Sequence, residues 1–271
     1  MGEKKAHHRG RQKKKGTGII STLVLIIAIV VFCYSAFQLY KIVSGYREGQ
    51  NEYDKIKSIA IENPGKEHPE EEESPADRFR VNFDELLAIN PDTVGWIRFS
   101  PEPAQINYPL VHCGDNSTYL NKTFSANENT VGAIFVNTYN HADFNDRNTI
   151  IYGHRMNDNS MFHDLAKYGD KAFWEANPYF YIYTPDGREI VYHIYSAGEV
   201  KDTSDTYITE FESDEAYQNF LTVTKQAAAY DTGVEVDISD TVVTLSTCTK
   251  ESNENRFVVR GVKESESREG E

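Results

Sequence analysis

The first strong pattern in the chain is an uncharged, mainly apolar run of 19 residues from Ile19 to Phe37. As an α-helix, which rises about 1.5 Å per residue, this run spans roughly 28 Å, close to the hydrocarbon thickness of a bilayer. A cleaved signal peptide usually has a shorter apolar region, and the Tyr40 and Lys41 that follow are typical of a membrane interface. The run therefore predicts a single transmembrane helix over residues 19–41.

Seven Lys and Arg residues in segment 1–18 precede this helix, against one acid, Glu3. Basic flanks stay in the cytoplasm, which places everything after about residue 42 outside the cell. Eight of the 28 Lys and Arg residues lie at or before Lys41, so the exported part has 20 cations, 41 acids and a net charge of −21. This surface argues against nucleic acid or anionic lipid as a partner of the exported part.

The segment between anchor and folded part changes character near residue 61. Residues 44–60 are compatible with a polar juxtamembrane helix, whereas residues 61–78 contain three prolines and the acidic block Glu70–Glu73, which is typical of an extended spacer. We expect five parts: a basic tail (1–18), an anchor (19–41), a juxtamembrane and linker segment (42–78), a catalytic domain (79–264) and a polar tail (265–271).

Short runs rich in β-branched and aromatic residues follow from about residue 79. Many short strands with few helical crossovers favour an antiparallel barrel or sandwich, so the fold is expected to be mainly β with peripheral helices. Eight strands are expected, at Thr93–Phe99, Ile106–Val111, Gly132–Val136, Asn148–Tyr152, Tyr179–Thr184, Glu189–Ala197, Thr241–Thr247 and Arg256–Lys263.

Helices and one turn complete the expected elements. A short amphipathic helix begins near Phe83, and a longer one follows Ser213, which is placed to be its N-cap. Residues Met161–Tyr168 form a candidate third helix. The sequence Pro185-Asp186-Gly187 predicts a hairpin turn between the fifth and sixth strands.

Cys248 is the first candidate for chemistry. Phosphate loops, dinucleotide fingerprints, HExxH helices and GxSxG elbows do not occur in the sequence. Three cysteines are too few for a disulfide framework, and Cys33 lies inside the anchor. Cys248 ends an apolar strand where a loop opens, a suitable place for a site on a rigid scaffold. Taken alone, a free cysteine is more often a small buried hydrophobe.

His154 and Arg256 also lie at strand boundaries. Gly153 permits a sharp exit from the fourth strand just before His154, and Arg256 opens the last strand eight residues after Cys248. Each residue alone is ordinary, since the chain has eight histidines and Arg256 follows an acidic run. Together the three supply a nucleophile, a proton shuttle and a cation for developing negative charge, which acyl transfer requires.

The combined pattern resembles the sortase signature. It consists of Thr-Leu-Ser-Thr-Cys at 244–248, Arg-Phe-Val-Val from Arg256 and Tyr-Gly-His at 152–154. The helix after Ser213 and the segment 157–168 resemble the class B branch of that family. The resemblance implies a closed eight-stranded sortase-type β-barrel preceded by a single transmembrane helix. It also implies Cys248 as nucleophile, His154 as acid/base and Arg256 as oxyanion partner, with no metal or cofactor.

The same resemblance implies a membrane-anchored cysteine transpeptidase of a Gram-positive bacterium. Such an enzyme cleaves a C-terminal sorting motif of the NPxTx or LPxTx type in secreted proteins, through a thioacyl-enzyme, and transfers them to a peptidoglycan precursor amine. The protein would be a single-pass cell-membrane protein with a cytoplasmic N-terminus and an extracellular catalytic domain. Ser246 and Thr247 either line the substrate groove or are strand residues of no special role.

Three alternatives remain at this stage. A hydrolytic cysteine peptidase would use the same Cys248 and His154 but resolve the thioester with water. A stalked adhesion or receptor ectodomain would bury an inert Cys248. A metal-dependent enzyme could use His141, His154 and His163, although their spacing matches no recognised ligand motif.

Overall fold

The computed structural model describes residues 16–63, 79–249 and 254–268. By packing, the chain divides into a helical segment up to Ser44 and a compact unit that begins at Gly45. Most of the predicted basic tail, residues 64–78 of the predicted 61–78 spacer and the last three residues lie outside the described residues. The first three residues of that spacer form the short strand β1 (Ile61–Asn63). The compact unit therefore includes residues 45–60, which precede the predicted 79–264 domain in the sequence.

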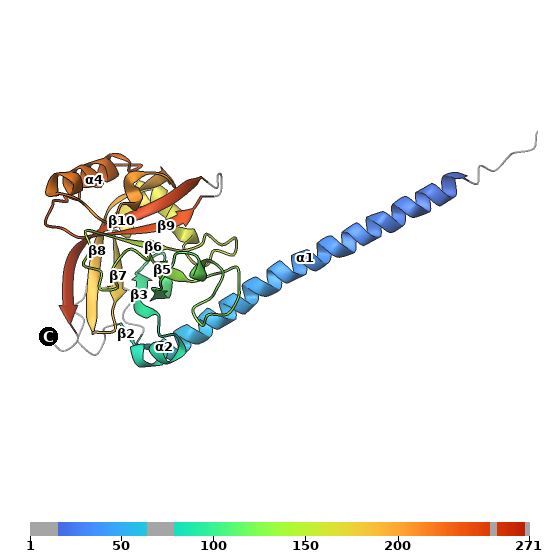
Figure 1. The fold of residues 1–271 in the computed structure, drawn as a ribbon, viewed down its shortest axis with the longest axis horizontal. Coiled ribbons are helices and arrows are strands. Elements are labelled where there is room, and N and C mark those ends of the chain that lie inside the picture. Colours follow the sequence, from blue (N-terminus) through green and yellow to red (C-terminus); the bar gives the residue numbers. More distant parts are fainter. Residues whose placement is uncertain (1–15, 64–78, 250–253, 269–271) are drawn as a thin grey trace, which may run out of the picture. The chain divides into compact units, whose positions relative to one another are not determined.

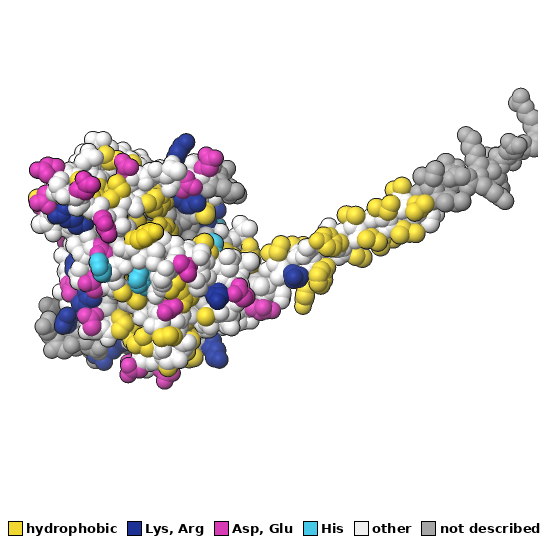
Figure 2. All heavy atoms as spheres, in the orientation of Figure 1, with side chains coloured by type: hydrophobic (Ala, Val, Ile, Leu, Met, Phe, Trp, Pro, Cys, Tyr) yellow, Lys and Arg dark blue, Asp and Glu magenta, His cyan; other side chains and the backbone are white. Residues whose placement is uncertain are grey.

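The first helix, α1 (Gly16–Ala60), contains the predicted anchor. From Ser21 onward this helix is long and apolar enough to cross a membrane. No residue of its most apolar stretch is buried against the described part of the chain. Large hydrophobic side chains between Leu23 and Val43 are exposed along it (Figure 2). An exposed apolar helix of this length is a candidate membrane span, as the sequence predicts.

Eight strands close into a barrel in the order β10-β8-β7-β3-β4-β5-β6-β9 (Figure 1). The expected antiparallel pairing is wrong at two joins, because β4 pairs with β5 and β6 pairs with β9 in parallel. The strands are β3 (Thr93–Phe99), β4 (Asn107–Val111), β5 (Ile134–Val136), β6 (Asn148–Tyr152), β7 (Tyr179–Tyr183), β8 (Arg188–Lys201), β9 (Val242–Cys248) and β10 (Asn255–Arg268).

All eight predicted strands are present, and the differences concern their ends. β8 extends four residues past the predicted Ala197, and β10 continues through residues 265–268, the start of the predicted polar tail. The β8 extension pairs with the start of β10, where Lys201 lies opposite Asn255. The β10 extension pairs with the start of β8, where Arg268 lies opposite Arg188. Strand pairing thus extends polar segments whose composition alone does not favour a strand.

Peripheral helices cover the barrel. Ser213 caps α4 (Asp214–Gln226), because its hydroxyl oxygen accepts a hydrogen bond from the Ala216 N–H at 3.2 Å. The predicted helix at Met161–Tyr168 is instead a 3-10 helix, because its hydrogen bonds run from i+3 to i. The remaining elements are α2 (Phe83–Ile89), α3 (Lys171–Ala176), α4 (Asp214–Gln226), η1 (Thr118–Leu120), η2 (His163–Gly169), η3 (Asp205–Tyr207), and the paired strands β1 (Ile61–Asn63) and β2 (Arg80–Val81).

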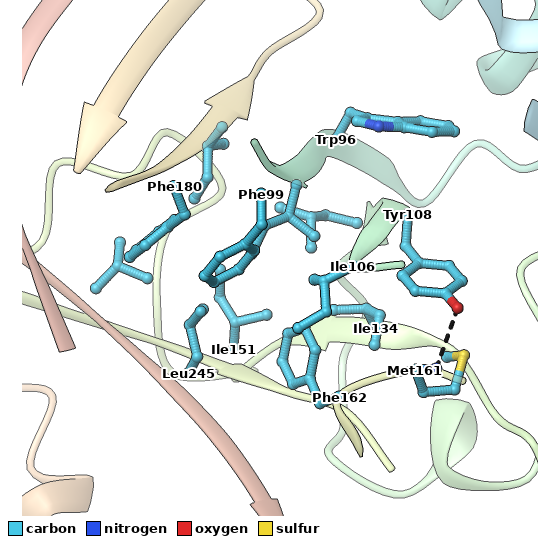
Figure 3. Packing of buried hydrophobic residues seen from close by; sticks show 14 of the residues in the cluster. Trp96, Phe99, Ile106, Tyr108, Ile134, Ile151, Met161, Phe162, Phe180 and Leu245 are labelled. Atoms are coloured by element: carbon cyan, nitrogen blue, oxygen red, sulfur yellow. Dashed lines mark hydrogen bonds between the residues drawn. The ribbon is translucent and has the colours of Figure 1, made fainter. Parts of the chain in front are cut away.

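Aromatic and aliphatic side chains fill the barrel (Figure 3). Phe180 stacks on Phe99 with ring centroids 5.3 Å apart and on Tyr192 at 5.0 Å. Ile151 of β6 and Leu245 of β9 are fully buried in the same core. Buried side chains therefore anchor β6 one residue before its last residue, Tyr152, and β9 three residues before its last residue, Cys248.

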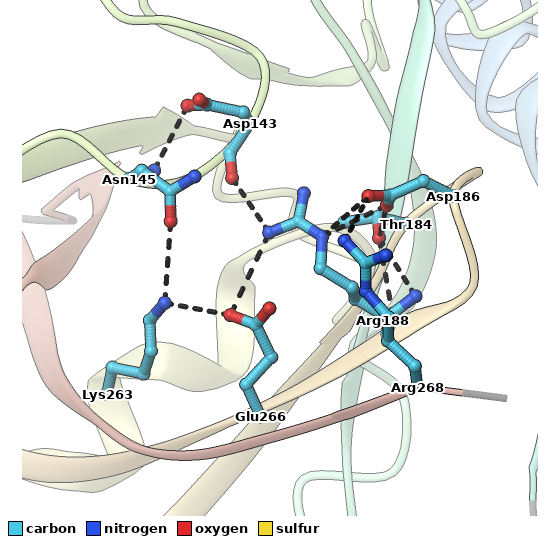
Figure 4. A network of polar contacts seen from close by, with 8 residues as sticks. All are labelled: Asp143, Asn145, Thr184, Asp186, Arg188, Lys263, Glu266 and Arg268. Carbon is cyan, nitrogen blue, oxygen red and sulfur yellow. Dashed lines mark hydrogen bonds and ion pairs between the residues drawn. The ribbon is translucent and has the colours of Figure 1, made fainter. Parts of the chain in front are cut away.

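A polar network fastens the far end of the long β8–β10 pair (Figure 4). Arg188 has a side chain only 8% exposed and donates to both Asp186 oxygens, at 2.9 and 3.0 Å, and to the Asp143 carbonyl at 3.1 Å. Burial would raise the pKa of Asp186, but hydrogen bonds from Thr184 and Arg188 outweigh it and hold the pKa below its ordinary value. Stability from this carboxylate is therefore present above about pH 4 and is lost as the pH falls through the lowered pKa.

Arg188→Met is expected to lower the free energy of unfolding by about 1–3 kcal/mol, because it removes the two hydrogen bonds to the Asp186 carboxylate and the one to the Asp143 carbonyl. Urea unfolding of the full chain in detergent measures this. The matched control is Arg268→Met, since Arg268 contacts the same Asp186 at 3.6 Å but its side chain is 57% exposed. The control is expected to cost at most about 1 kcal/mol. Equal losses in the two variants would contradict a special role for the buried arginine.

Candidate active site

Strands β6, β9 and β10 are adjacent in the barrel (Figure 1). The pairing register brings Cys248, His154 and Arg256 to the same end of these strands. Cys248, the last residue of β9, is the register partner of Arg256 in β10. The parallel strand β6 pairs Tyr152 with Ser246, and the Gly153 N–H donates to the Ser246 carbonyl at 3.1 Å, so His154 follows β6 at the end of the barrel where β9 ends. Neighbouring strands are about 4.8 Å apart. Residues up to 102 positions apart in the sequence thus lie at the same end of three adjacent strands, with His154 two residues past the end of β6.

Cys248 is exposed and carries a free thiol. Side chains alternate along a strand, so Ser246 shares the face of Cys248, whereas Thr247 shares that of the core residue Leu245. Ser246 is buried, with its Oγ 2.9 Å from the Tyr207 hydroxyl. The buried Thr247 hydroxyl has no hydrogen-bond partner within the described part of the chain. The two residues considered for a substrate groove therefore face opposite sides of β9.

His154 is half-buried and held at two points. Its Nε2 lies 2.7 Å from the Leu120 carbonyl oxygen, and its own carbonyl accepts a hydrogen bond from the Phe162 N–H at 2.9 Å. A carbonyl oxygen can only accept, so this contact requires the hydrogen to be on Nε2. The structure therefore leaves Nδ1 as the ring nitrogen able to exchange a proton in chemistry.

Two glycines make room for His154. Gly132 has φ +65°, and a Cβ there would lie 2.8 Å from His154 Cδ2. This left-handed backbone and this close approach both favour glycine. At Gly153, a Cβ would lie 2.5 Å from Ile134 Cδ1 and 2.6 Å from Phe162 Cδ2. The strand exit predicted at Gly153 thus has a packing reason, while Gly132 carries no sequence signal that links it to the histidine.

Arg256 is held at the start of β10 by neighbours that sequence reasoning did not identify. Its side chain is 25% exposed, and Nη2 lies 3.7 Å from Asp202 Oδ2 while Nη1 donates to the Asn255 carbonyl at 3.0 Å. The Asp202 N–H in turn donates to the Glu254 carbonyl at 2.9 Å. Asp202 thereby joins the loop after β8 to the start of β10, next to Arg256.

Two tyrosines lie beside these residues on the outer face of the barrel. The rings of Tyr152 and Tyr207 stack, with centroids 6.2 Å apart and an angle of 17° between planes. Burial raises the pKa of Tyr152 to about 12 and also raises the pKa of Tyr207, while the charge of Arg256 acts in the opposite direction on both. Both phenols therefore stay protonated near neutral pH and can donate hydrogen bonds.

The three histidines considered for a metal have separate partners. His141 Nδ1 lies 2.7 Å from Asp146 Oδ1, and His163 Nδ1 lies 2.5 Å from the Met156 carbonyl oxygen. His154 uses Nε2 for Leu120, as described above. Among the described residues, no group of three or more His, Cys, Asp and Glu side chains is arranged to hold a metal ion.

Comparison with known proteins agrees with this geometry. The family model for the sortase domain matches residues 101–264. Sortase B of Staphylococcus aureus (strain NCTC 8325 / PS 47) is 33% identical over 232 residues, which cover 84% of this chain and 88% of the relative. This chain belongs to the sortase family. The resemblance inferred from the His, Cys and Arg motifs is therefore confirmed.

Solved structures extend the similarity to the fold of the sortase domain. The crystal structure of sortase B from B. anthracis in complex with AAEK1 has a TM-score of 0.69 and 32% identity, covering 82% of this chain and 99% of that chain. A Staphylococcus aureus sortase B–substrate complex has a TM-score of 0.62 and 33% identity, covering 67% and 83%. The expected sortase-type barrel is confirmed, and family membership supports a transpeptidase.

Proposed function

We propose that this chain is a membrane-anchored cysteine transpeptidase with Cys248 as nucleophile, His154 as acid/base and Arg256 as oxyanion partner. The observation that carries the proposal is the convergence of these three residues at the ends of β6, β9 and β10. An exposed thiol on a rigid strand end, beside a histidine and an arginine, meets the needs of acyl transfer. Membership of the sortase family supports the same reaction class.

In the first half-reaction, the Cys248 thiolate attacks a peptide carbonyl carbon in the sorting motif. A C–S bond forms and the carbonyl oxygen gains negative charge, which the Arg256 guanidinium stabilises. The tetrahedral intermediate then expels the amine part of the peptide. Protonated His154 gives the leaving nitrogen its proton from Nδ1, since Nε2 is bonded to the Leu120 carbonyl. The acyl part remains on sulfur as a thioester.

In the second half-reaction, an incoming primary amine attacks the thioester. Neutral His154 takes a proton from the attacking nitrogen, the C–N bond forms, and the C–S bond breaks to regenerate the thiolate. The product is a new amide bond, with no net change in oxidation state. No metal or cofactor takes part in this scheme.

The proposed substrates are secreted proteins with a C-terminal motif of the NPxTx or LPxTx type, and the proposed acceptor is a peptidoglycan precursor amine. A Staphylococcus aureus sortase B–substrate complex on a similar barrel supports substrate binding by this domain. The apolar part of α1 supports anchoring in the cell membrane, and the basic segment before it supports a cytoplasmic N-terminus with the catalytic domain outside.

Mass spectrometry of the full chain in detergent micelles tests the proposal. The protein is incubated with a panel of Asn-Pro-x-Thr and Leu-Pro-x-Thr peptides, with and without triglycine as the amine. We expect a thioacyl adduct that peptide mapping places on Cys248 and not on Cys33 or Cys113. Triglycine should convert the adduct to a ligated peptide.

Two results would contradict the proposal in different ways. Efficient release of free acid despite saturating triglycine would indicate the hydrolytic peptidase. A failure of every panel peptide to acylate Cys248, together with slow alkylation of that thiol in the folded protein, would favour the stalked binding domain. Rapid alkylation is expected, because Cys248 is exposed.

A further inference from the structure

The last part of α1 is packed into the same loop that holds His154. Gly45, Gly49, Glu52, Tyr53 and Ile56 follow helical spacing and form one face. This face contacts the loop between η1 and β5: the Asn129 amide donates to the Gly45 carbonyl at 3.0 Å, and Glu52 accepts from the Ser125 N–H and the Asn127 amide, each at 3.1 Å. Leu120, the last residue of η1, and Gly132, near the end of the loop, both contact the histidine.

Tyr53 is the buried centre of this contact, with 3% of its surface exposed. Its hydroxyl donates to the Gly132 carbonyl at 2.6 Å and accepts from the Phe124 N–H at 3.2 Å. Burial raises the pKa of Tyr53 well above its ordinary value, so the phenol remains a donor throughout the working pH range. One hydroxyl therefore bonds to both the beginning of the loop, at Phe124, and its end, at Gly132.

Gly132 lies directly against the imidazole ring of His154. The Gly132 Cα lies so close to the imidazole that an added Cβ would be 2.8 Å from His154 Cδ2. Gly132 also has left-handed backbone, which glycine adopts without strain and which lets the chain approach the imidazole this closely. The hydrogen bond from Tyr53 fixes the carbonyl of this glycine. A shift of the loop at Gly132 would therefore move the surface on which the ring of His154 rests.

A second path runs through Tyr108 (Figure 3). The Tyr53 and Tyr108 rings pack edge to face with centroids 5.3 Å apart, and the Met161 N–H donates to the Tyr108 hydroxyl at 3.1 Å. The next residue, Phe162, donates its N–H to the His154 carbonyl at 2.9 Å. Tyr53 thus supports the ring of the histidine on one side and its backbone on the other.

We propose that Tyr53 is a positioning residue for His154, so that the juxtamembrane end of α1 is part of the catalytic apparatus. This inference rests on the acid/base role proposed for His154. Tyr53 does not touch the reacting atoms; it holds Gly132 and the loop that follows Leu120. Misplacement of a proton shuttle affects the chemical steps more than substrate binding, because the shuttle acts in the transition state.

Tyr53→Phe in the full chain, in detergent micelles, tests this inference. It removes one hydroxyl and keeps the ring. With triglycine and the faster of an Asn-Pro-x-Thr and a Leu-Pro-x-Thr peptide, we expect kcat to fall roughly tenfold or more, with KM within about twofold of wild type. NMR of ¹⁵N-histidine-labelled protein should show faster solvent exchange of the His154 Nε2–H. Tyr46→Phe, which removes a hydroxyl from the same helix, is the matched control and should change neither readout.

Unchanged kcat and unchanged Nε2–H exchange in Tyr53→Phe would overturn the inference, as would a lower melting temperature with normal kcat. If Tyr53→Phe does not fold at the assay temperature, Tyr108→Phe interrupts the second path and is judged by the same readouts. His154→Ala in the same assay separates the two proposals. Full activity of His154→Ala would refute the proposed function, whereas loss there with normal activity in Tyr53→Phe would refute only the role of Tyr53.

Discussion

Replacing Cys248 with alanine is expected to abolish acylation by sorting-motif peptides and to lower turnover by more than about 10⁴-fold, because no other group supplies the covalent intermediate. The side chain is exposed at the end of β9, so its loss should leave the melting temperature nearly unchanged. Intact-protein mass spectrometry detects the adduct, and chromatography of the ligated peptide with triglycine measures the rate. Loss of activity with an intact fold distinguishes a nucleophile from a buried structural cysteine.

Cys113→Ala is the matched control for this experiment. Cys113 is also a free thiol of the compact unit, half-buried with its Sγ 3.3 Å from the Asp115 carbonyl oxygen. It lies outside the proposed machinery, so adduct formation and turnover should remain at wild-type levels. An adduct that persists in Cys248→Ala and disappears in Cys113→Ala would reverse the assignment of the nucleophile.

The strands were predictable because alternation and β-branched composition are local properties. β3 and β6 have the predicted bounds, and the predicted hairpin turn at residues 185–187 joins β7 to β8, with Gly187 at φ +82°. Pair direction is not local: β4 and β5 are joined through a long loop, which allows them to lie parallel, and nothing in either strand specifies this. The polar extension of β10 to Arg268 likewise depends on its partner β8.

The candidate site divides in the same way. Cys248, His154 and Arg256 could be found because their side chains are chemically distinctive and lie in recognisable motifs. Leu120 acts through its carbonyl oxygen, which every residue possesses, so its side chain gives no signal. Tyr53 lies 101 positions from His154 in a segment that sequence alone assigns to the membrane-proximal helix. Its position beneath the site follows from tertiary packing alone.

His154→Ala is expected to lower kcat/KM by about 10²- to 10⁴-fold, the usual contribution of a general acid–base group. The loss should fall mainly on kcat, because the proton is transferred in the transition state while the peptide binds through other contacts. Pre-steady-state acylation, followed by mass spectrometry, measures the first half-reaction separately from transfer to triglycine. Both half-reactions should slow, since one histidine protonates the leaving amine and deprotonates the incoming one.

The matched control is His141→Ala, because His141 is an exposed histidine whose Nδ1 pairs with Asp146 at 2.7 Å, away from the three strand ends. The hydrogen bond to Asp146 raises the pKa of His141. Replacing His141 with alanine should nevertheless leave the rates of both half-reactions unchanged. A slower acylation with normal transfer in His154→Ala would contradict a single shared proton shuttle. Such a result would mean that a group other than His154 deprotonates the incoming amine. Equal slowing of the two steps instead follows from one imidazole that works through Nδ1 alone.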